Sequence, residues 1–183
     1  MHILAFNGSP RNKGNGATLI KTILEAARKN GHTAEVVNLY DKKISGCRAC
    51  DRCKAVLDNC NIKDDMTTIT RKIIKADALI ISSPVYMGQI SGPMKTFLDR
   101  WCVFFDGDFK MRHLPGKKLV TIVTSGAPAT TYRDVSGYLG KWLGGFFKLK
   151  LAGSLSAGNL SGKNDVLKQK DVMKSAEKIG RSL

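Results

Sequence analysis

The sequence of 183 residues has few histidines, half as many acidic as basic side chains, and no long hydrophobic run. Its longest apolar stretches, residues 78–85 and 118–126, are far shorter than the roughly 20 residues of a membrane-spanning helix. The N-terminus resembles no secretory leader. The three histidines, His2, His32 and His113, are too far apart to form a motif, and we interpret them as structural or surface residues. We therefore expect no membrane association and a cytoplasmic location.

The net charge of +15 is spread along the whole chain. No arginine-rich arm, zinc-finger spacing or aromatic-interleaved basic strand accompanies it, and these are the marks of nucleic-acid-binding proteins. We therefore expect no nucleic-acid ligand. Diffuse positive charge is better suited to an acidic protein partner or an anionic cofactor. A basic binding module without redox activity is kept as a third alternative.

Short, nearly continuous apolar runs alternate with segments of helical periodicity. The expected strands are residues 2–7, 34–40, 78–85, 117–126 and 148–158. The expected helices are residues 19–27, 65–75, 92–105, 133–147 and 164–181. Strands that are apolar throughout are typical of a parallel sheet covered on both faces. The pattern predicts one α/β domain over residues 1–183, with a doubly wound, flavodoxin-like sheet of five parallel strands, helices on both faces and a cysteine-rich loop (46–61) after the second strand.

Ligands of such sheets bind at the carboxyl ends of the strands, which marks the loops 8–18, 84–91 and 124–131. The first loop, GSPRNKGNGAT, joins a strand to a helix N-terminus, whose free amides and positive dipole end attract anions. Its polar side chains add hydroxyl, amide and guanidinium donors that suit a phosphate. The spacing matches neither the P-loop nor the dinucleotide fingerprint. We predict a phosphate-binding loop; the alternative is a glycine-rich turn without a ligand.

Three motifs together carry a family resemblance. They are GSPR followed by GNGAT, SSPVYMG at 82–88 and GPMKTFLDRW at 92–101. With them, the chain resembles the NADPH-dependent FMN reductase family of flavodoxin-like proteins over roughly residues 1–126. Its compact cysteines resemble the iron-sulfur flavoprotein branch of that family. One departure is Gly16 after Asn15, where relatives often carry Thr or Ser; Thr18 would replace that hydroxyl, or the amide alone would suffice.

The resemblance implies an FMN site. The FMN phosphate would be held by Ser9, Arg11, Asn15, Gly16, Ala17 and Thr18. The loop against the isoalloxazine ring would consist of Pro84, Val85, Tyr86, Met87 and Gly88, although Tyr86 also fits an ordinary half-buried aromatic at a strand end. By position, Thr124, Ser125 and Gly126 would form the third loop. No catalytic acid, base or nucleophile is expected, because FMN carries the chemistry of hydride transfer.

Four of the five cysteines lie within fourteen residues, at Cys47, Cys50, Cys53 and Cys60. The first three have the spacing of a bacterial ferredoxin run, whereas the fourth follows a longer gap and lacks the ferredoxin proline. Disulfides are not expected in a reducing cytoplasm, and structural zinc sites typically use two separated C-x2-C pairs. We predict four ligands of a [4Fe–4S] cluster, with zinc and metal-free thiols as the alternatives.

Three residues of the GPMKTFLDRW segment and its extension also have expected roles. Cys102, in an apolar helix, should pack in the core. Asp99 and Arg100 should form a pair on the helix surface, and the resemblance places this stretch near a subunit interface.

We therefore expect an FMN-dependent oxidoreductase of the iron-sulfur flavoprotein type, which passes electrons between an acidic carrier such as ferredoxin, a [4Fe–4S] cluster and FMN. The alternative is a cluster-free NAD(P)H-dependent FMN or quinone reductase. The final acceptor would be a quinone, a flavin, an oxygen species or another protein. Because the cysteine loop starts from one edge of the sheet, a homodimer or homotetramer could bring the cluster to a neighbour's flavin.

Overall fold

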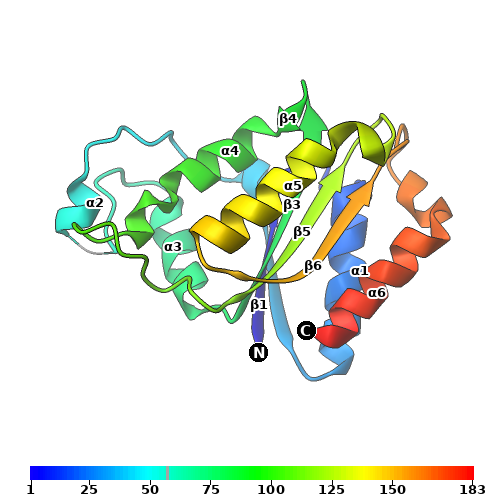
Figure 1. Ribbon diagram of the computed structural model, residues 1–183, viewed down its shortest axis with the longest axis horizontal. Coiled ribbons are helices and arrows are strands. Elements are labelled where there is room, and N and C mark those ends of the chain that lie inside the picture. Colours follow the sequence, from blue (N-terminus) through cyan, green and yellow to red (C-terminus); the bar gives the residue numbers. More distant parts are fainter. Residues whose placement is uncertain (57) are drawn as a thin grey trace.

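The computed structural model describes residues 1–56 and 58–183, so that Leu57 of the predicted loop 46–61 lies outside the described residues (Figure 1). The parallel strands are β1 (His2–Asn7), β2 (Thr33–Asn38), β3 (Ala78–Tyr86), β5 (Lys118–Thr124) and β6 (Lys150–Ala157). They pair in the order β2-β1-β3-β5-β6, and a short β4 (Gln89–Ile90) runs antiparallel to the end of β3. The predicted flavodoxin-like, doubly wound sheet of five parallel strands is confirmed.

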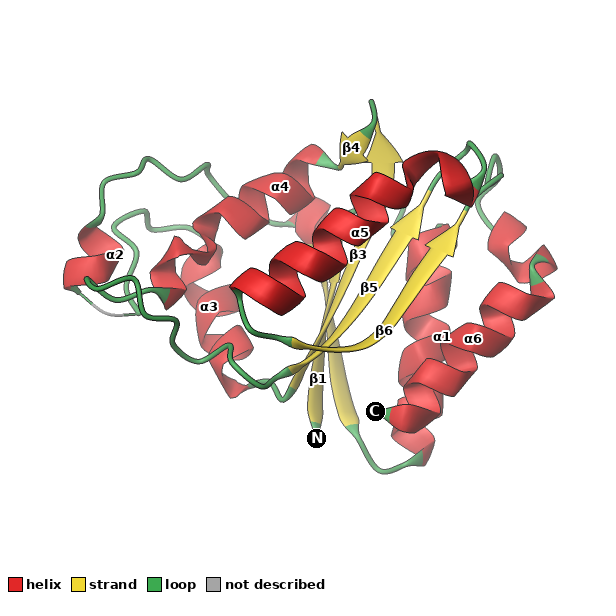
Figure 2. Cartoon of the chain, viewed as in Figure 1, coloured by secondary structure: helices red, strands yellow, loops and turns green. Residues whose placement is uncertain are grey.

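Helices cover both faces of the sheet (Figure 2). The longer ones are α1 (Asn15–Lys29), α3 (Met66–Lys75), α4 (Gly92–Asp99), α5 (Arg133–Lys141) and α6 (Lys170–Ser182), and α2 (Arg52–Ala55) is a single turn. Short 3-10 turns are η1 (Leu39–Asp41), η2 (Arg100–Phe104), η3 (Ala129–Tyr132) and η5 (Asp165–Lys168), and η4 (Trp142–Phe146) is a π turn. Among the described residues, none of these helices has the length and apolar character needed to cross a membrane.

The alternation of side chains along the buried strands divides the core into two halves. On one face, Leu4 and Phe6 of β1 pack with apolar residues of α3, α4 and α5. On the other face, Ile3 and Ala5 pack with α1 and α6. The α1–α6 contact is so close that a Cβ on Gly180 would lie 2.2 Å from the Ile23 carbonyl oxygen. Burying both faces in this way is what a sheet of continuously apolar strands requires.

Two predicted helices end earlier than expected. The helix predicted over 92–105 is α-helical only to Asp99 and then tightens into η2. With three residues per turn, residues i and i+3 share a side, and here both Trp101 and Phe104 are fully buried. The helix predicted over 133–147 is α-helical to Lys141 and widens into the π turn η4. The end of α4 matters for function, because η2 packs against the cysteine loop.

Candidate cofactor site and cysteine loop

A cleft of about 210 Å³ lies at the carboxyl ends of the central strands. It is lined by the three predicted loops and by the segment after β6, which the sequence analysis missed. The lining residues are Ser9, Arg11, Gly14, Asn15, Gly16, Pro84, Val85, Tyr86, Thr124, Ser125, Gly126, Leu160 and Ser161. Most of the predicted cofactor-binding residues therefore meet in one place. The missed segment carries no motif, and only its position after the last strand could have indicated it.

Four of the predicted residues do not line this cleft. Ala17 and Thr18 line a separate groove along α1 and the edge strand β2. The Thr18 hydroxyl donates to the Gly14 carbonyl oxygen at 3.1 Å, so it is already used inside the helix. Met87 and Gly88 form the turn between β3 and β4, where Met87 is fully exposed at a φ of 48°. Their contacts with a cofactor stay predictions.

The phosphate-loop end of the cleft is shaped by short polar side chains. The buried Asn7 carboxamide oxygen accepts from the Ser9 amide at 3.1 Å, and the Ser9 hydroxyl oxygen accepts from the Arg11 amide at 3.1 Å. A Cβ on Gly16 would lie 2.8 Å from the Ser82 hydroxyl oxygen, so glycine allows the start of α1 to sit directly on β3. The first amides of α1, which lack acceptors inside the helix, are thereby held at the cleft.

Asn15 has a structural role that the sequence did not indicate. Its side-chain nitrogen donates to the Gly162 carbonyl oxygen at 2.8 Å, and its side-chain oxygen accepts from the Val166 amide at 3.0 Å. Both ends of the carboxamide are thus occupied in tying the segment after β6 to the start of α1. The backbone amide of Asn15 and the second N–H of its carboxamide are the donors that remain for a ligand.

The opposite end of the cleft is formed by apolar residues that follow the buried part of β3. The Ser91 amide donates to the Ser83 hydroxyl oxygen at 2.9 Å, and the Ser91 hydroxyl donates to the Gly8 carbonyl oxygen at 2.6 Å. These bonds fix the β3–β4 loop against the phosphate loop. Tyr86 is 43% exposed, as a wall for a flat ring would be. Arg11 is the charged residue among the described lining residues, so the cleft suits an anion.

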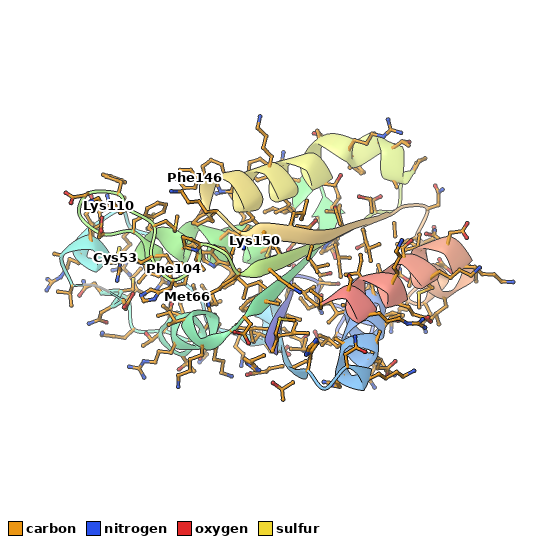
Figure 3. All side chains as sticks on the ribbon, turned by 60° about the horizontal axis from the view of Figure 1, so that its bottom comes forward. Cys53, Met66, Phe104, Lys110, Phe146 and Lys150 are labelled. Carbon is orange, nitrogen blue, oxygen red and sulfur yellow. The ribbon has the colours of Figure 1, made fainter. Side chains whose placement is uncertain are left out.

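The loop that carries the four clustered cysteines includes α2, which lies at the left of the molecule, away from the carboxyl ends of β5 and β6 at the upper right (Figure 1). Figure 3 shows Cys53 and Lys110 together at this end. Cys47 and Cys50 are exposed, and Cys53 and Cys60 are partly buried. Burial, and then the charges of Cys102, Cys60 and Cys47, raise the pKa of the Cys53 thiol. Cys53 therefore lies near Cys47, Cys60 and Cys102, although no three such side chains in the described part of the chain converge as metal ligands.

The donor set nevertheless has the chemistry of an iron-sulfur site. Thiolates are the protein ligands of most iron-sulfur clusters and are also favoured by zinc. The left-handed conformations of Ala49 and Asp51, at φ of 49° and 52°, turn the backbone sharply between successive cysteines. The four cysteines thus supply the donor atoms that a thiolate-bound metal requires, but in the described loop their sulfur atoms do not converge on one point.

The expected core position of Cys102 is wrong. Its side chain is exposed and lines a surface hollow together with Lys54 and Phe109. The reason is the tightening of the chain into η2, which buries Trp101 and Phe104 and leaves Cys102 facing outward. A fifth thiol consequently stands beside the cysteine loop.

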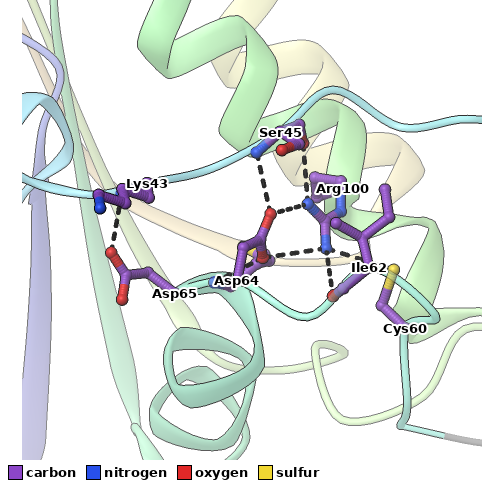
Figure 4. Close-up of polar contacts among 8 residues, drawn as sticks. Lys43, Ser45, Cys60, Ile62, Asp64, Asp65 and Arg100 are labelled. Atoms are coloured by element: carbon purple, nitrogen blue, oxygen red, sulfur yellow. Dashed lines mark hydrogen bonds and ion pairs between the residues drawn. The ribbon is translucent and has the colours of Figure 1, made fainter.

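The expected surface pair of Asp99 and Arg100 is also wrong. Arg100 is only 3% exposed and forms an ion pair with Asp64 at 2.7 Å (Figure 4). Asp99 instead pairs with Lys95 on the surface. Burial disfavours the Asp64 carboxylate, but hydrogen bonds from Arg100 and the Ser45 amide outweigh it and hold the pKa of Asp64 below its usual value. Burial likewise opposes the charge of Arg100, and the hydrogen bond to Asp64 nevertheless raises its pKa. Both groups are thus kept charged.

The sequence of this chain is similar to one protein family and to several curated proteins. The family described as NADPH-dependent FMN reductase matches residues 1–143. An "iron-sulfur flavoprotein" of Archaeoglobus fulgidus is 37% identical over 126 residues, which are 69% of this chain and 60% of that protein. An iron-sulfur flavoprotein of Methanocaldococcus jannaschii is 32% identical over 139 residues, 75% of this chain and 71% of that protein.

Among solved structures, an NAD(P)H:quinone oxidoreductase from Methanothermobacter marburgensis superposes with a TM-score of 0.74 at 17% identity. The superposition covers 99% of this chain and 96% of that one. At this identity the likeness concerns the fold alone. The match with the Archaeoglobus relative, by contrast, is close enough to concern the sequence, and this chain spans about three fifths of that protein's length.

Proposed function

The chain belongs to the NADPH-dependent FMN reductase family, and from this premise we propose that it is an FMN-dependent oxidoreductase of the iron-sulfur flavoprotein type. The resemblance predicted from its motifs, to this family and to its iron-sulfur flavoproteins, is confirmed by the relatives of that name. The observation that carries the proposal is the cleft at the strand ends, which joins a helix N-terminus and an arginine to an apolar wall.

In this cleft the residues of the phosphate loop would bind the FMN phosphate. The amides at the start of α1 and the Arg11 guanidinium supply donors at one end, and no carboxylate of the described residues lines the cleft to repel an anion. Pro84, Val85 and Tyr86 would pack against the ring, and the loops after β5 and β6 would close the remaining side. When bound, FMN supplies the two-electron and one-electron chemistry, so the protein's part is to bind, orient and shield it.

The cysteine loop would provide the second redox centre. Cys47, Cys50, Cys53 and Cys60 would hold a [4Fe–4S] cluster, which exchanges single electrons. Arg48, Arg52 and Lys54 in the same loop would partly offset the negative charge of such a site. The net positive charge of the chain would attract an acidic electron carrier such as ferredoxin. This attraction would speed association at low ionic strength and weaken as salt is added.

A homodimer or homotetramer would complete the path between the two centres. The carboxyl ends of the strands, where the cleft lies, and the α2 region of the cysteine loop are far apart in the fold (Figure 1), which favours transfer between the loop of one subunit and the cleft of its neighbour. We propose the cytoplasm as the location. An intact protein that sediments as a monomer, yet transfers electrons rapidly between both centres, would contradict this arrangement.

A second candidate is a cluster-free NAD(P)H-dependent FMN or quinone reductase. It is favoured by one observation, the absence of three converging metal ligands among the described residues. It would use the same FMN cleft and differ only in leaving the thiols reduced and metal-free.

Absorption spectra of protein purified without air distinguish these proposals. We expect the two flavin bands together with a broad brown shoulder, accompanied by iron and sulfide in stoichiometric amounts. A yellow protein without iron would favour the second candidate. A colourless protein that cannot be reconstituted with FMN would refute both enzymatic proposals and leave the basic binding module.

Replacing Arg11 with Ala should weaken FMN binding about 10- to 150-fold, because a hydrogen bond to a charged group contributes about 1.5–3 kcal/mol. Fluorescence titration of apoprotein with FMN measures this effect. Lys13→Ala is the matched control, since Lys13 is also a cation of the same loop but lines the neighbouring groove. Equal affinities of the two variants would remove Arg11 from the phosphate site.

A further inference from the structure

Arg100 of η2 joins the two ends of the cysteine loop. One guanidinium nitrogen, Nη1, donates to the Ser45 carbonyl oxygen at 2.8 Å, on the entering side of the loop. The other, Nη2, donates to the Ile62 carbonyl oxygen at 3.5 Å and to the Cys60 sulfur at 3.3 Å, on the leaving side (Figure 4). A single buried side chain thus contacts both ends of the segment that carries all four clustered cysteines.

The position of this guanidinium is fixed independently of the sulfur. Arg100 and Asp64 form two hydrogen bonds, at 2.7 and 3.3 Å, in the geometry of a fork. The side chain of Arg100 is 1% exposed and that of Asp64 is 8% exposed. The Asp64 carboxylate also accepts from the amides of Ser45 and Met66, at 2.9 and 3.0 Å. Arg100 therefore reaches Cys60 from a rigid base.

A second arginine, Arg112, also reaches the loop but not a sulfur. It forms an ion pair with Asp58 at 3.0 Å and donates to the Val103 carbonyl oxygen at 3.1 Å. The Cys47 sulfur, by contrast, accepts from the Ala49 backbone amide, at 3.5 Å. Within the described residues, Cys60 is the clustered cysteine whose sulfur receives a charged side-chain donor.

We propose that Arg100 is the positioning residue for Cys60, the fourth thiolate ligand; this rests on the proposed function of the cysteine loop. Its N–H group stabilises negative charge on the Cys60 sulfur, and its planar fork sets where that sulfur stands relative to the base of the loop. Lysine keeps the charge but cannot donate to Asp64, Ser45 and Cys60 from one plane. Cys60 is separated from the other three cysteines by the longest gap in sequence, and the contact with Arg100 holds its sulfur near the base of the loop.

The test is a Co²⁺ titration of reduced, metal-free protein, followed by the thiolate-to-cobalt absorption. We expect Arg100→Lys to bind Co²⁺ about 10- to 100-fold more weakly than wild type, the usual effect of losing a partner of a metal ligand. Arg112→Lys, the matched control, should bind like wild type. In the Cys60→Ser background, Arg100→Lys should cause no further loss, because Arg100 acts through that sulfur.

Each outcome decides the proposal. If Arg100→Lys binds Co²⁺ as tightly as wild type, the role of Arg100 is overturned but the proposed cluster is not. A further loss of Co²⁺ affinity in the Cys60→Ser background also overturns only the role of Arg100, because it would show a general effect on loop folding. A wild-type protein that binds neither Co²⁺ nor iron overturns the proposed cluster as well. If circular dichroism shows that Arg100→Lys is unfolded, the double variant Arg100→Gln with Asp64→Asn takes its place in the same titrations, with and without Cys60→Ser. Removing both charges leaves no unpaired charge buried.

Discussion

Asp64→Ala should lower the free energy of unfolding by about 3–5 kcal/mol, the cost of leaving one partner of a buried ion pair uncompensated. Arg100 would stay buried at 3% exposure without its counter-charge, and the amides of Ser45 and Met66 would lose their acceptor. The entering and leaving ends of the cysteine loop would separate as a consequence. Urea unfolding followed by circular dichroism measures the change in free energy.

Asp99→Ala is the matched control for this variant. Asp99 lies one residue before Arg100, and its pair with Lys95 is exposed on both sides, so its loss should cost less than about 1 kcal/mol. If the two variants were equally stable, the buried pair would not be the anchor of the loop.

The same ion pair also predicts how stability depends on pH. The pKa of Asp64 is lower in the folded than in the unfolded chain, where an aspartate titrates near about 3.9. The stabilisation is therefore fully present above that unfolded value and is lost as the pH falls through the folded pKa. Wild type and Asp64→Ala should consequently converge in stability in strong acid and differ most near neutral pH.

The sheet could be predicted because its signal is local. Runs such as ALII at 78–81 are apolar at every position, a pattern typical of a parallel strand covered on both faces. The meeting of three loops at one cleft then follows from topology, since the carboxyl ends of parallel strands share an edge. The fourth loop could not be predicted because Leu160 and Ser161 carry no motif, and because the phosphate loop that contains Asn15, its anchor, predicts a phosphate contact for that residue.

The errors concern contacts between residues distant in sequence. Asp99 and Arg100 are adjacent, so the sequence favours a surface pair, yet the partner of Arg100 is Asp64, 36 residues away. Likewise, an extended α-helix would bury Cys102, whereas the change to a 3-10 turn after Asp99 rotates it outward. Neither local periodicity nor residue type encodes where a helix tightens, because tertiary packing of Trp101 and Phe104 decides it.

Gly158→Ala should destabilise the protein by about 3 kcal/mol and weaken FMN binding about tenfold or more. A Cβ at this position would lie 2.1 Å from the Ala129 amide nitrogen and 2.5 Å from the Ala127 carbonyl oxygen, and a backbone cannot yield as a flexible side chain can. The loops after β5 and β6 would have to separate. Thermal unfolding and FMN titration of the same preparations measure the two effects.

The effect on FMN binding follows from what these two loops carry. The Asn159 amide donates to the Ala127 carbonyl oxygen at 2.9 Å and the Leu160 amide to the Ser125 carbonyl oxygen at 3.1 Å, so one loop positions the other at the cleft. Gly137→Ala is the control: nothing lies within 4 Å of its Cβ in the middle of α5, and alanine should stabilise that helix by up to about 1 kcal/mol. A Gly158→Ala protein with wild-type stability and affinity would show that close packing of these loops does not shape the cleft.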